Sequence, residues 1–189
     1  LAEQIMSDHP LHTTAVNENN TPYEELFMAD NHQFFGKEII FAVPQEAIKL
    51  NSYGATNYLI RAAIGGDMDP AAQGVGGGWG GLSLTAEFSD KFDLDNDARA
   101  MFYTKYGKSI DDMYSFASTD VATMQTGYKC VKYSNMLSDG TKGNESGPGS
   151  VDTDYPLFRS ADAYLMYAEC AKRGAGDAAK GLEAFNAIR

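Results

Sequence analysis

The pattern of hydrophobic and polar positions predicts little regular structure in the first third of the chain. Residues 38–43, EIIFAV, form a β-branched and aromatic run that Pro44 closes, and this pattern predicts a strand. Pro22 follows the polar stretch NENNT and can begin a short helical turn. Residues 45–63 mix small, aromatic and polar side chains without a clean period, so we expect an irregular segment there.

The middle of the chain is dominated by glycine. Residues 65–81 hold eight of the 19 glycines, and the backbone entropy lost at that density disfavours a helix or a sheet interior. A loop is therefore predicted. Behind it, Thr85 can cap a short amphipathic helix expected near 85–93. The apolar positions of that helix recur every four residues: Leu84, Phe88 and Phe92.

The segment before the C-terminal helices is aromatic and then strongly polar. Weak alternation around 127–133 favours a hairpin. Residues 138–154, SDGTKGNESGPGSVDTD, consist of turn-forming and polar residues throughout. This composition predicts a flexible linker.

From residue 155 onward the pattern becomes helical. Gly174 and Gly176 interrupt it, and Asp177 can cap a second helix. The resulting helical hairpin is similar to one repeat of a tetratricopeptide array, of which only one copy is visible. Such a unit does not bury its own apolar face and is expected to need neighbours. The apolar stripe comprises Leu157, Ala161, Leu165, Ala168, Ala171, Ala178, Leu182 and Phe185.

Charge and chain composition exclude some classes of partner. The 26 acidic and 15 basic side chains give a net charge of −11, which disfavours nucleic acid and anionic lipid surfaces. No run approaches the roughly 18 apolar residues of a membrane-spanning helix. The sequence starts without Met and stops at Arg189 inside a helical pattern, so we expect a piece of a longer protein.

The cysteines and the acidic run 93–97 give no strong metal-site signal. Cys130 and Cys170 belong to no C-x-x-C motif, and buried free thiols are expected, with a single disulfide as the alternative. The run DLDND resembles the start of an EF-hand loop, but Ala98 stands where that loop needs Gly. A local Asp97–Arg99 pair is the simpler expectation, and a Ca²⁺ ion on loop carbonyls and one aspartate is the alternative.

Other motifs argue against cofactors and catalysis. His9 and His12 are spaced H-x-x-H without a convincing third ligand, so surface histidines are expected and no metal site is predicted. Residues 76–81, GGGWGG, match G-x-G-x-x-G but lack the preceding strand of a dinucleotide site. No nucleophile elbow, H-E-x-x-H or P-loop occurs, so no catalytic residue and no cofactor are predicted.

Several segments together resemble the SusD/RagB family. Residues 155–170 and 184–189 resemble its signatures YP-x-x-R-x-A-D/E-x-x-L-M-x-A-E and x-x-N-x-I/V-R. Residues 38–43 are similar to its E-I/V-I-F strand, residues 84–99 to its L-x-x-x-F-x-x-x-D-x-R element, and residues 129–135 to its K-Y step. The elements occur in the order that the family has.

The resemblance implies a mainly α fold: a tetratricopeptide-like helical hairpin scaffold with long irregular loops and a few short strands. It implies a Bacteroidetes lipoprotein at the cell surface, held to the outer membrane only by a lipid anchor outside this sequence. Such proteins bind polysaccharide or oligosaccharide without catalysis and deliver it to a TonB-dependent, SusC-like transporter. We expect a partial SusD-like domain over 1–189, with a loop-rich glycan-facing region (1–137), the linker (138–154) and the hairpin (155–189).

Aromatic side chains supply the candidate glycan site. A pyranose ring packs its C–H face on an aromatic plane, while its hydroxyls need polar partners at the rim. Trp79, the only tryptophan, lies between two glycines that leave its face open. The predicted glycan-binding residues are Trp79, Tyr53, Tyr58, Asn57 and Arg61.

Other interpretations stay open on the sequence alone. Trp79 can instead anchor its loop on the core. The chain can be a tetratricopeptide-like interaction scaffold that has no glycan site. A glycoside hydrolase is a further alternative, because a catalytic carboxylate pair is defined by its spatial separation and not by sequence spacing.

Overall fold

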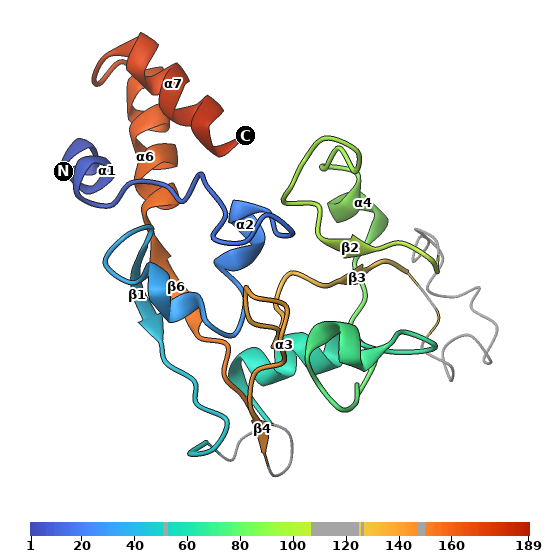
Figure 1. Cartoon of the computed structure of the whole chain (residues 1–189). Coiled ribbons are helices and arrows are strands. Elements are labelled where there is room, and N and C mark those ends of the chain that lie inside the picture. The colour runs from blue at the N-terminus through green and yellow to red at the C-terminus, as the bar shows by residue number, and fades with distance from the viewer. Residues whose placement is uncertain (51–52, 107–124, 126, 147–149) are drawn as a thin grey trace.

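Helices outweigh strands in the computed structural model, which describes residues 1–50, 53–106, 125, 127–146 and 150–189. Long irregular segments connect the elements (Figure 1), which confirms the predicted fold class. The helices are α1 (Ala2–Asp8), α2 (Pro22–Glu25), α3 (Ala55–Ala63), α4 (Ala86–Ser89), α6 (Ser160–Lys172) and α7 (Ala178–Ile188), with 3₁₀ turns η1 (Asn31–Phe34) and η2 (Pro70–Gln73). The strands are β1 (Ile39–Val43), β2 (Phe102–Tyr103), β3 (Lys129–Cys130), β4 (Glu145–Ser146), β5 (Ser150–Val151) and β6 (Tyr155–Arg159).

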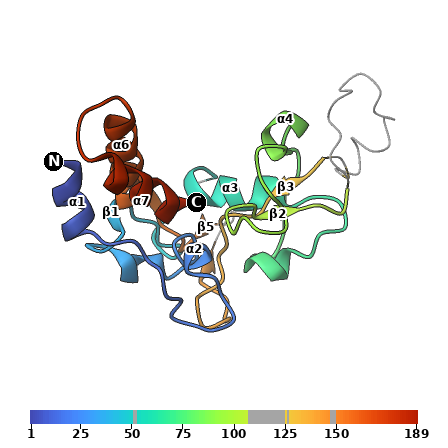
Figure 2. The same ribbon diagram turned by 90° about the horizontal axis from the view of Figure 1, so that it is seen from above.

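Helices α6 and α7 form the predicted hairpin at one end of the molecule, and α1 also packs against α6 (Figures 1 and 2). The Asp177 side chain accepts a hydrogen bond from the Lys180 amide at 2.8 Å, which confirms the predicted cap. The two helices approach closely at Gly181, where a Cβ would lie 2.4 Å from that of Ala171. Lys180 also bonds Glu3 at 2.6 Å, which links α7 to α1.

The strand predicted over 38–43 is confirmed as β1, which pairs antiparallel with β6. The helical stripe was expected to start at Leu157, but Leu157 lies in β6 and the helix begins at Ser160. The antiparallel pairing with β1, which includes Phe41 opposite Phe158 and Ala42 opposite Pro156, keeps this segment extended. Glu38, which precedes β1, binds Arg159 at 2.6 Å, so two of the family-like segments meet through an ion pair.

In the part of the chain that the structure describes, two clusters of buried side chains form the core. The first comprises Leu26, Phe27, Phe34, Ile39 and Ala42, and the second comprises Ile60, Ile64, Met68, Val75 and Val151. The partly buried ring of Tyr133 packs against both clusters. Burial raises the pKa of Tyr133, in keeping with its position between them.

Three expectations about local structure were wrong. Residues 55–63, expected to be irregular, form α3. The helix near 85–93 is only the short α4, although Thr85 caps it as predicted. Within 127–133 the strand β3 pairs with β2, not with a neighbour in that stretch.

Residues 138–154 contact the rest of the fold at several described positions. Ser138 bonds both carboxylate oxygens of Asp30, and Asn20 donates to the Ser138 carbonyl at 2.8 Å. Thr153 is fully buried, and its hydroxyl donates to the Ser134 carbonyl at 2.7 Å. The division into 1–137, 138–154 and 155–189 stays a prediction.

The cysteines and His12 differ from expectation. Both cysteines are free, as expected, but Cys130 is only partly buried and Cys170 is exposed. His12 is not a surface histidine, because its Nε2 lies 2.7 Å from the fully buried carboxylate of Glu25. Val16 and Asn17 also donate backbone hydrogen bonds to Glu25. Burial would raise the pKa of Glu25, but these donors outweigh it and lower that pKa.

The acidic run 93–97 forms the local pair predicted for it. Arg99 binds Asp97 through two guanidinium nitrogens, at 2.8 and 2.7 Å. Among the residues that the structure describes, no group of three or more His, Cys, Asp or Glu side chains could hold a metal ion. Within the same residues, no helix has the length and apolar content needed to cross a bilayer.

Candidate functional site

The structure brings the three predicted aromatic side chains together in one exposed cluster. The ring of Trp79 lies 5.9 Å from that of Tyr53 and 6.4 Å from that of Tyr58, between centroids. The planes are tilted by 59° and 49°, so the rings form an uneven surface and not a flat stack. The exposed fractions are 38% for Trp79, 65% for Tyr53 and 48% for Tyr58. This aromatic cluster is therefore available to a ligand.

Helix α3 places Tyr58 on the outside of the molecule. Its buried face is formed by Thr56, Asn57, Ile60 and Arg61, while Tyr58 points away from that face. Thr56 is fully buried, and its hydroxyl donates to the Thr153 carbonyl at 2.5 Å. The inner face of α3 thus carries polar side chains with partners, which explains why hydrophobic periodicity did not predict this helix.

The glycine loop 65–81 docks on the C-terminal turn of α3 through backbone hydrogen bonds. The Trp79 amide donates to the Arg61 carbonyl at 2.8 Å, and the Gly80 amide donates to the Ile64 carbonyl at 2.8 Å. The Leu82 amide donates to the Ala62 carbonyl at 3.1 Å. The last carbonyl groups of a helix have no partner within the helix, so the loop satisfies them and is held in return.

Gly78 permits this close docking. A Cβ at this position would lie 2.3 Å from the Ile64 carbonyl oxygen and 2.5 Å from an Ile64 side-chain carbon. Glycine is therefore required by the approach of two backbones. The neighbouring Gly80 has a φ of 67°, a conformation that L side chains rarely adopt.

Asn57 and Arg61, predicted as polar partners for a sugar, are buried, with 2% and 5% exposure. Arg61 Nε donates to Asn57 Oδ1 at 2.9 Å, and Arg61 Nη1 donates to the Gly77 carbonyl at 2.6 Å. Both side chains hold the fold together, so the prediction of a rim position was wrong for them. The physical reason is that α3 turns these positions inward.

Glu145 is a component of the site that sequence reasoning missed. Its carboxylate accepts hydrogen bonds from the Gly76 amide, at 2.9 and 3.1 Å, and forms ion pairs with Arg61 and Lys142. Burial would raise the pKa of Glu145, but Lys142, the Gly76 amide and Arg61 together lower it to about 2. No local motif marks Glu145, because its partners Gly76 and Arg61 lie far away in the sequence.

A shallow pocket of about 230 Å³ lies beside Trp79, lined by Ile64, Gly65, Gly66, Met68, Pro70, Gly78, Trp79 and Gly80. The hydroxyl of Tyr106 holds one wall, because it accepts from the Asp67 amide at 2.9 Å, donates to the Asp67 carboxylate and lies 3.2 Å from the Gly65 carbonyl oxygen. Burial, and then the hydrogen bond with the Asp67 carboxylate, raises the pKa of Tyr106 to about 12.

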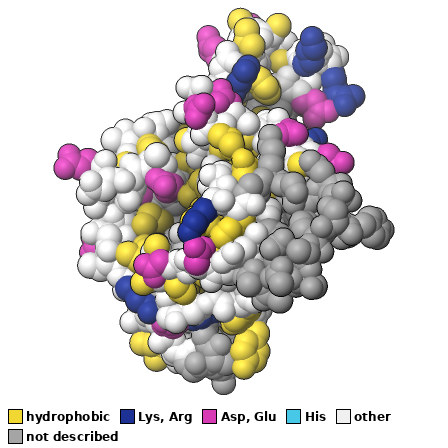
Figure 3. Space-filling model, turned by 90° about the vertical axis from the view of Figure 1, so that its right-hand side faces the viewer, with side chains coloured by type: hydrophobic (Ala, Val, Ile, Leu, Met, Phe, Trp, Pro, Cys, Tyr) yellow, Lys and Arg dark blue, Asp and Glu magenta, His cyan; other side chains and the backbone are white. Residues whose placement is uncertain are grey.

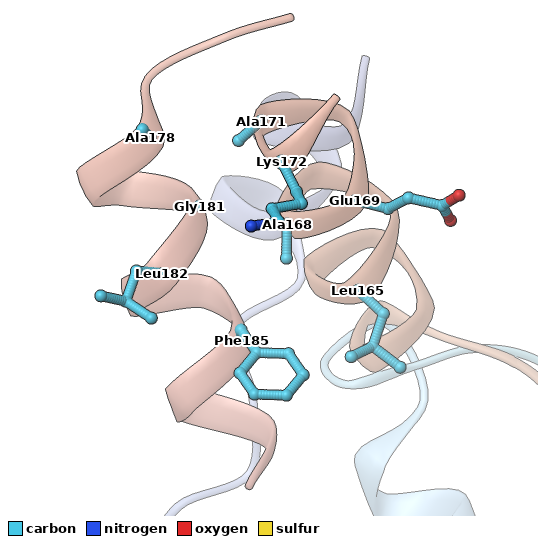
Figure 4. A pocket seen from close by; sticks show the side chains of 9 residues that line it. All are labelled: Leu165, Ala168, Glu169, Ala171, Lys172, Ala178, Gly181, Leu182 and Phe185. Carbon is cyan, nitrogen blue, oxygen red and sulfur yellow. The ribbon is translucent and has the colours of Figure 1, made fainter. Parts of the chain in front are cut away.

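A second concave surface, the α6–α7 groove, has a volume of about 540 Å³ and is almost entirely apolar. Figure 4 shows its lining side chains, which come from both helices of the hairpin: Leu165, Ala168, Glu169, Ala171, Lys172, Ala178, Gly181, Leu182 and Phe185. Leu165, Leu182 and Phe185 are all exposed. In Figure 3 hydrophobic side chains lie between charged ones in this upper part of the molecule. The hairpin leaves its apolar face open, as its pattern predicted.

Comparison with known proteins agrees with this arrangement. The family model described as the SusD family matches residues 100–189. The starch-binding protein SusD of Bacteroides thetaiotaomicron is 30% identical to this chain over an alignment of 199 positions. The alignment covers 84% of this chain and 35% of that protein. The chain belongs to the SusD family. The family resemblance of the sequence is thereby confirmed.

A solved structure supports the same fold for the SusD-family chain. The crystal structure of a SusD superfamily protein from Parabacteroides distasonis ATCC 8503 matches all of this chain with a TM-score of 0.57 and 19% identity. The match covers 37% of that protein. The chain therefore spans about a third of the length of each of these relatives.

Proposed function

We propose that this SusD-family chain forms part of a glycan-binding surface, on which Trp79, Tyr53 and Tyr58 stack against sugar rings. The exposed cluster of these three rings is the observation that carries the proposal. Aromatic planes bind the C–H face of a pyranose, and their burial by a ligand removes apolar surface from water. The name of the starch-binding relative supports a glycan ligand and makes starch the first probe.

The shape of the cluster favours an oligosaccharide over a single sugar. Its rings are tilted against one another, so different rings face different sugar units along a chain. The hydroxyl groups of Tyr53 and Tyr58 can each donate and accept a hydrogen bond at the rim, the role first predicted for Asn57 and Arg61. A single unit makes few contacts on so shallow a surface, whereas an oligomer adds contacts and rebinds.

Membership of the family supports three finer proposals. The chain binds glycan without cleaving it. The whole protein sits at the cell surface, lipid-anchored to the outer membrane. It delivers oligosaccharide to a TonB-dependent, SusC-like transporter. An assay for released reducing ends tests the first of these proposals, and release of sugar by the purified chain would contradict it.

The proposed function is tested by following Trp79 emission while soluble starch, maltoheptaose, glucose and a panel of plant, host and microbial polysaccharides are added. We expect a saturable change with one glycan class, with oligomers binding more tightly than glucose. Trp79→Ala should weaken binding at least about 10-fold in affinity electrophoresis, which corresponds to about 1.4 kcal/mol. Phe185→Ala is the matched control, because it removes an exposed ring in the α6–α7 groove.

Two outcomes would contradict the glycan proposal: no retardation of the wild-type chain by any glycan, or equal loss of binding in both variants.

A second candidate function is a protein-interaction scaffold that uses the α6–α7 groove. The observation that favours it is the open apolar surface between the two helices. On this interpretation Trp79→Ala changes nothing that is measured with glycans, because there is no glycan binding to lose. The titration described above therefore separates the two functions.

A further inference from the structure

Glu145 lies on β4, and its carboxylate joins two parts of the aromatic site that are distant in the sequence. One oxygen pairs with Arg61 of helix α3, and both oxygens accept from the amide of Gly76 in the glycine loop. Lys142 supplies a second positive charge. The side chain of Glu145 is 22% exposed and that of Arg61 only 6%, so this ion pair is poorly screened by water.

These contacts reach the aromatic cluster through a short stretch of backbone. Glu145 fixes the amide of Gly76, and Arg61 fixes the carbonyl of the next residue, Gly77. Two residues further on, the Trp79 amide is bound to the carbonyl of Arg61. Glu145 therefore holds the side chain of Arg61. Arg61 in turn binds the Trp79 loop twice, through its guanidinium group at the Gly77 carbonyl and through its own carbonyl at the Trp79 amide.

The loop between these anchors has little rigidity of its own. Residues 76–81 contain five glycines and one tryptophan, and glycine loses more conformational freedom on ordering than any other residue. Without external contacts such a segment samples many conformations, and the indole ring moves with it. Fixing a binding loop beforehand raises affinity, because less entropy is lost when the ligand binds.

We propose that Glu145 is a positioning residue for the aromatic cluster, which sets glycan affinity by holding Arg61 and Gly76 so that Trp79 faces the ligand beside Tyr53 and Tyr58. This inference rests on the proposed function of the cluster. Glu145 acts through its two partners and is not itself assigned a contact with sugar. The carboxylate is needed as a charged, two-oxygen acceptor, because it serves an amide and two cations at once.

The test uses Glu145→Ala and Glu145→Gln in the full chain, with Trp79 emission, acrylamide quenching of that emission, and affinity for the glycan that the wild-type chain binds best. In Glu145→Ala we expect quenching to rise about twofold and affinity to fall about 10-fold, as ligand-induced ordering becomes costlier. Glu145→Gln keeps an oxygen for the Gly76 amide, so its affinity should fall only about threefold. Glu169→Ala removes an arginine–carboxylate pair on α6 and is the matched control, with no expected change.

Each outcome bears on the proposal. The proposal is supported if glycan affinity falls less in Glu145→Gln than in Glu145→Ala, while circular dichroism shows that both variants still melt cooperatively. Wild-type quenching and affinity in Glu145→Ala would overturn it. Loss of a cooperative melt in both variants would also overturn it, because Glu145 would then stabilise the whole fold and not the loop in particular. If the wild-type chain binds no glycan, the proposed function fails, while a change in Trp79 quenching still supports the positioning role.

Discussion

Glu145 links the order of the Trp79 loop to the pH of the solution. Burial opposes its ionisation, but Lys142, the Gly76 amide and Arg61 lower its pKa from the ordinary 4.5 to about 2. A carboxyl group whose pKa is lower in the folded state stabilises that state fully above the unfolded pKa. The contribution is then lost as the pH falls toward the folded pKa. For Glu145 the loss extends from about pH 5 down to about pH 2.

We therefore expect the stability difference between the wild-type chain and Glu145→Gln to depend on pH. The variant should be less stable by about 1–3 kcal/mol at pH 7, because a charged acceptor is replaced by a neutral one. The difference should shrink as the pH is lowered from about 5 toward about 2, because over this range the Glu145 carboxyl takes up a proton in the unfolded wild-type chain while it stays ionised in the folded one. Urea unfolding at a series of pH values measures it. A difference that stays constant over this range would contradict the assignment.

Residue chemistry and the family resemblance together selected the three aromatic side chains that the structure brings together in the candidate site. Trp79 stands out as the sole tryptophan in a glycine loop, and Tyr53 and Tyr58 stand out as the only aromatic residues of segment 45–63. The supporting residues were not predictable in the same way. Whether Arg61 faces a ligand or the core depends on the helix that carries it, and Glu145 meets Arg61 across 84 positions of sequence.

At the scale of elements, the site depends on how closely the glycine loop docks on α3. Gly78→Ala tests this contact. The added Cβ would meet the backbone and side chain of Ile64 at 2.3–2.6 Å, so the loop must shift away from the helix end. We expect a loss of about 1–3 kcal/mol in stability, larger than the gain of up to about 1 kcal/mol from a stiffer unfolded chain. Trp79 emission should change as well.

Gly77→Ala is the matched control for that substitution. A Cβ at Gly77 has no atom within 4 Å and the position has no left-handed φ, so the variant should be as stable as the wild-type chain or slightly more so. Thermal melts of both variants, with Trp79 emission as the local probe, give the comparison. Equal stability of the two variants would mean that the loop does not need its close contact with Ile64.

The elements themselves were predictable where a β-branched and aromatic run or a capping residue is encoded locally. Strand β1 and the caps at Thr85 and Asp177 are of this kind. Helix α3 was missed because its buried face includes Thr56, Asn57 and Arg61, whose partners come from other segments. Strand β6 was predicted as the start of a helix, because its pairing with β1 is a long-range contact that a helical pattern in the local sequence does not reveal.

At the scale of the whole molecule, the two candidate surfaces lie on different parts of the fold. The aromatic cluster lies on α3 and the glycine loop, and the groove lies on the α6–α7 hairpin (Figure 1). The proposed glycan surface and the apolar groove can therefore be changed independently. A substitution in the groove is expected to leave glycan affinity unaltered.

The groove predicts the solution behaviour of the chain. Leu165, Leu182 and Phe185 are exposed and line the groove, and a concave apolar surface of this kind favours association. We expect the wild-type chain to self-associate as its concentration rises, measured by sedimentation velocity. Leu182→Lys should weaken that association about 10-fold or more, because it places a charge where apolar surface is buried. Since Leu182 is 62% exposed, its replacement should change thermal stability little.

Met166→Lys is the control for this substitution. Met166 is as exposed as Leu182 and lies on α6, but it does not line the groove. The Met166→Lys substitution changes the hydrophobicity and charge of the chain in the same way as Leu182→Lys, so the two variants differ only in the position of the new lysine. Weaker association in the Leu182 variant alone assigns the contact to the groove. Equal weakening in both variants would assign it to net charge, and a wild-type chain that stays monomeric at every concentration would show that this apolar face is stable in water.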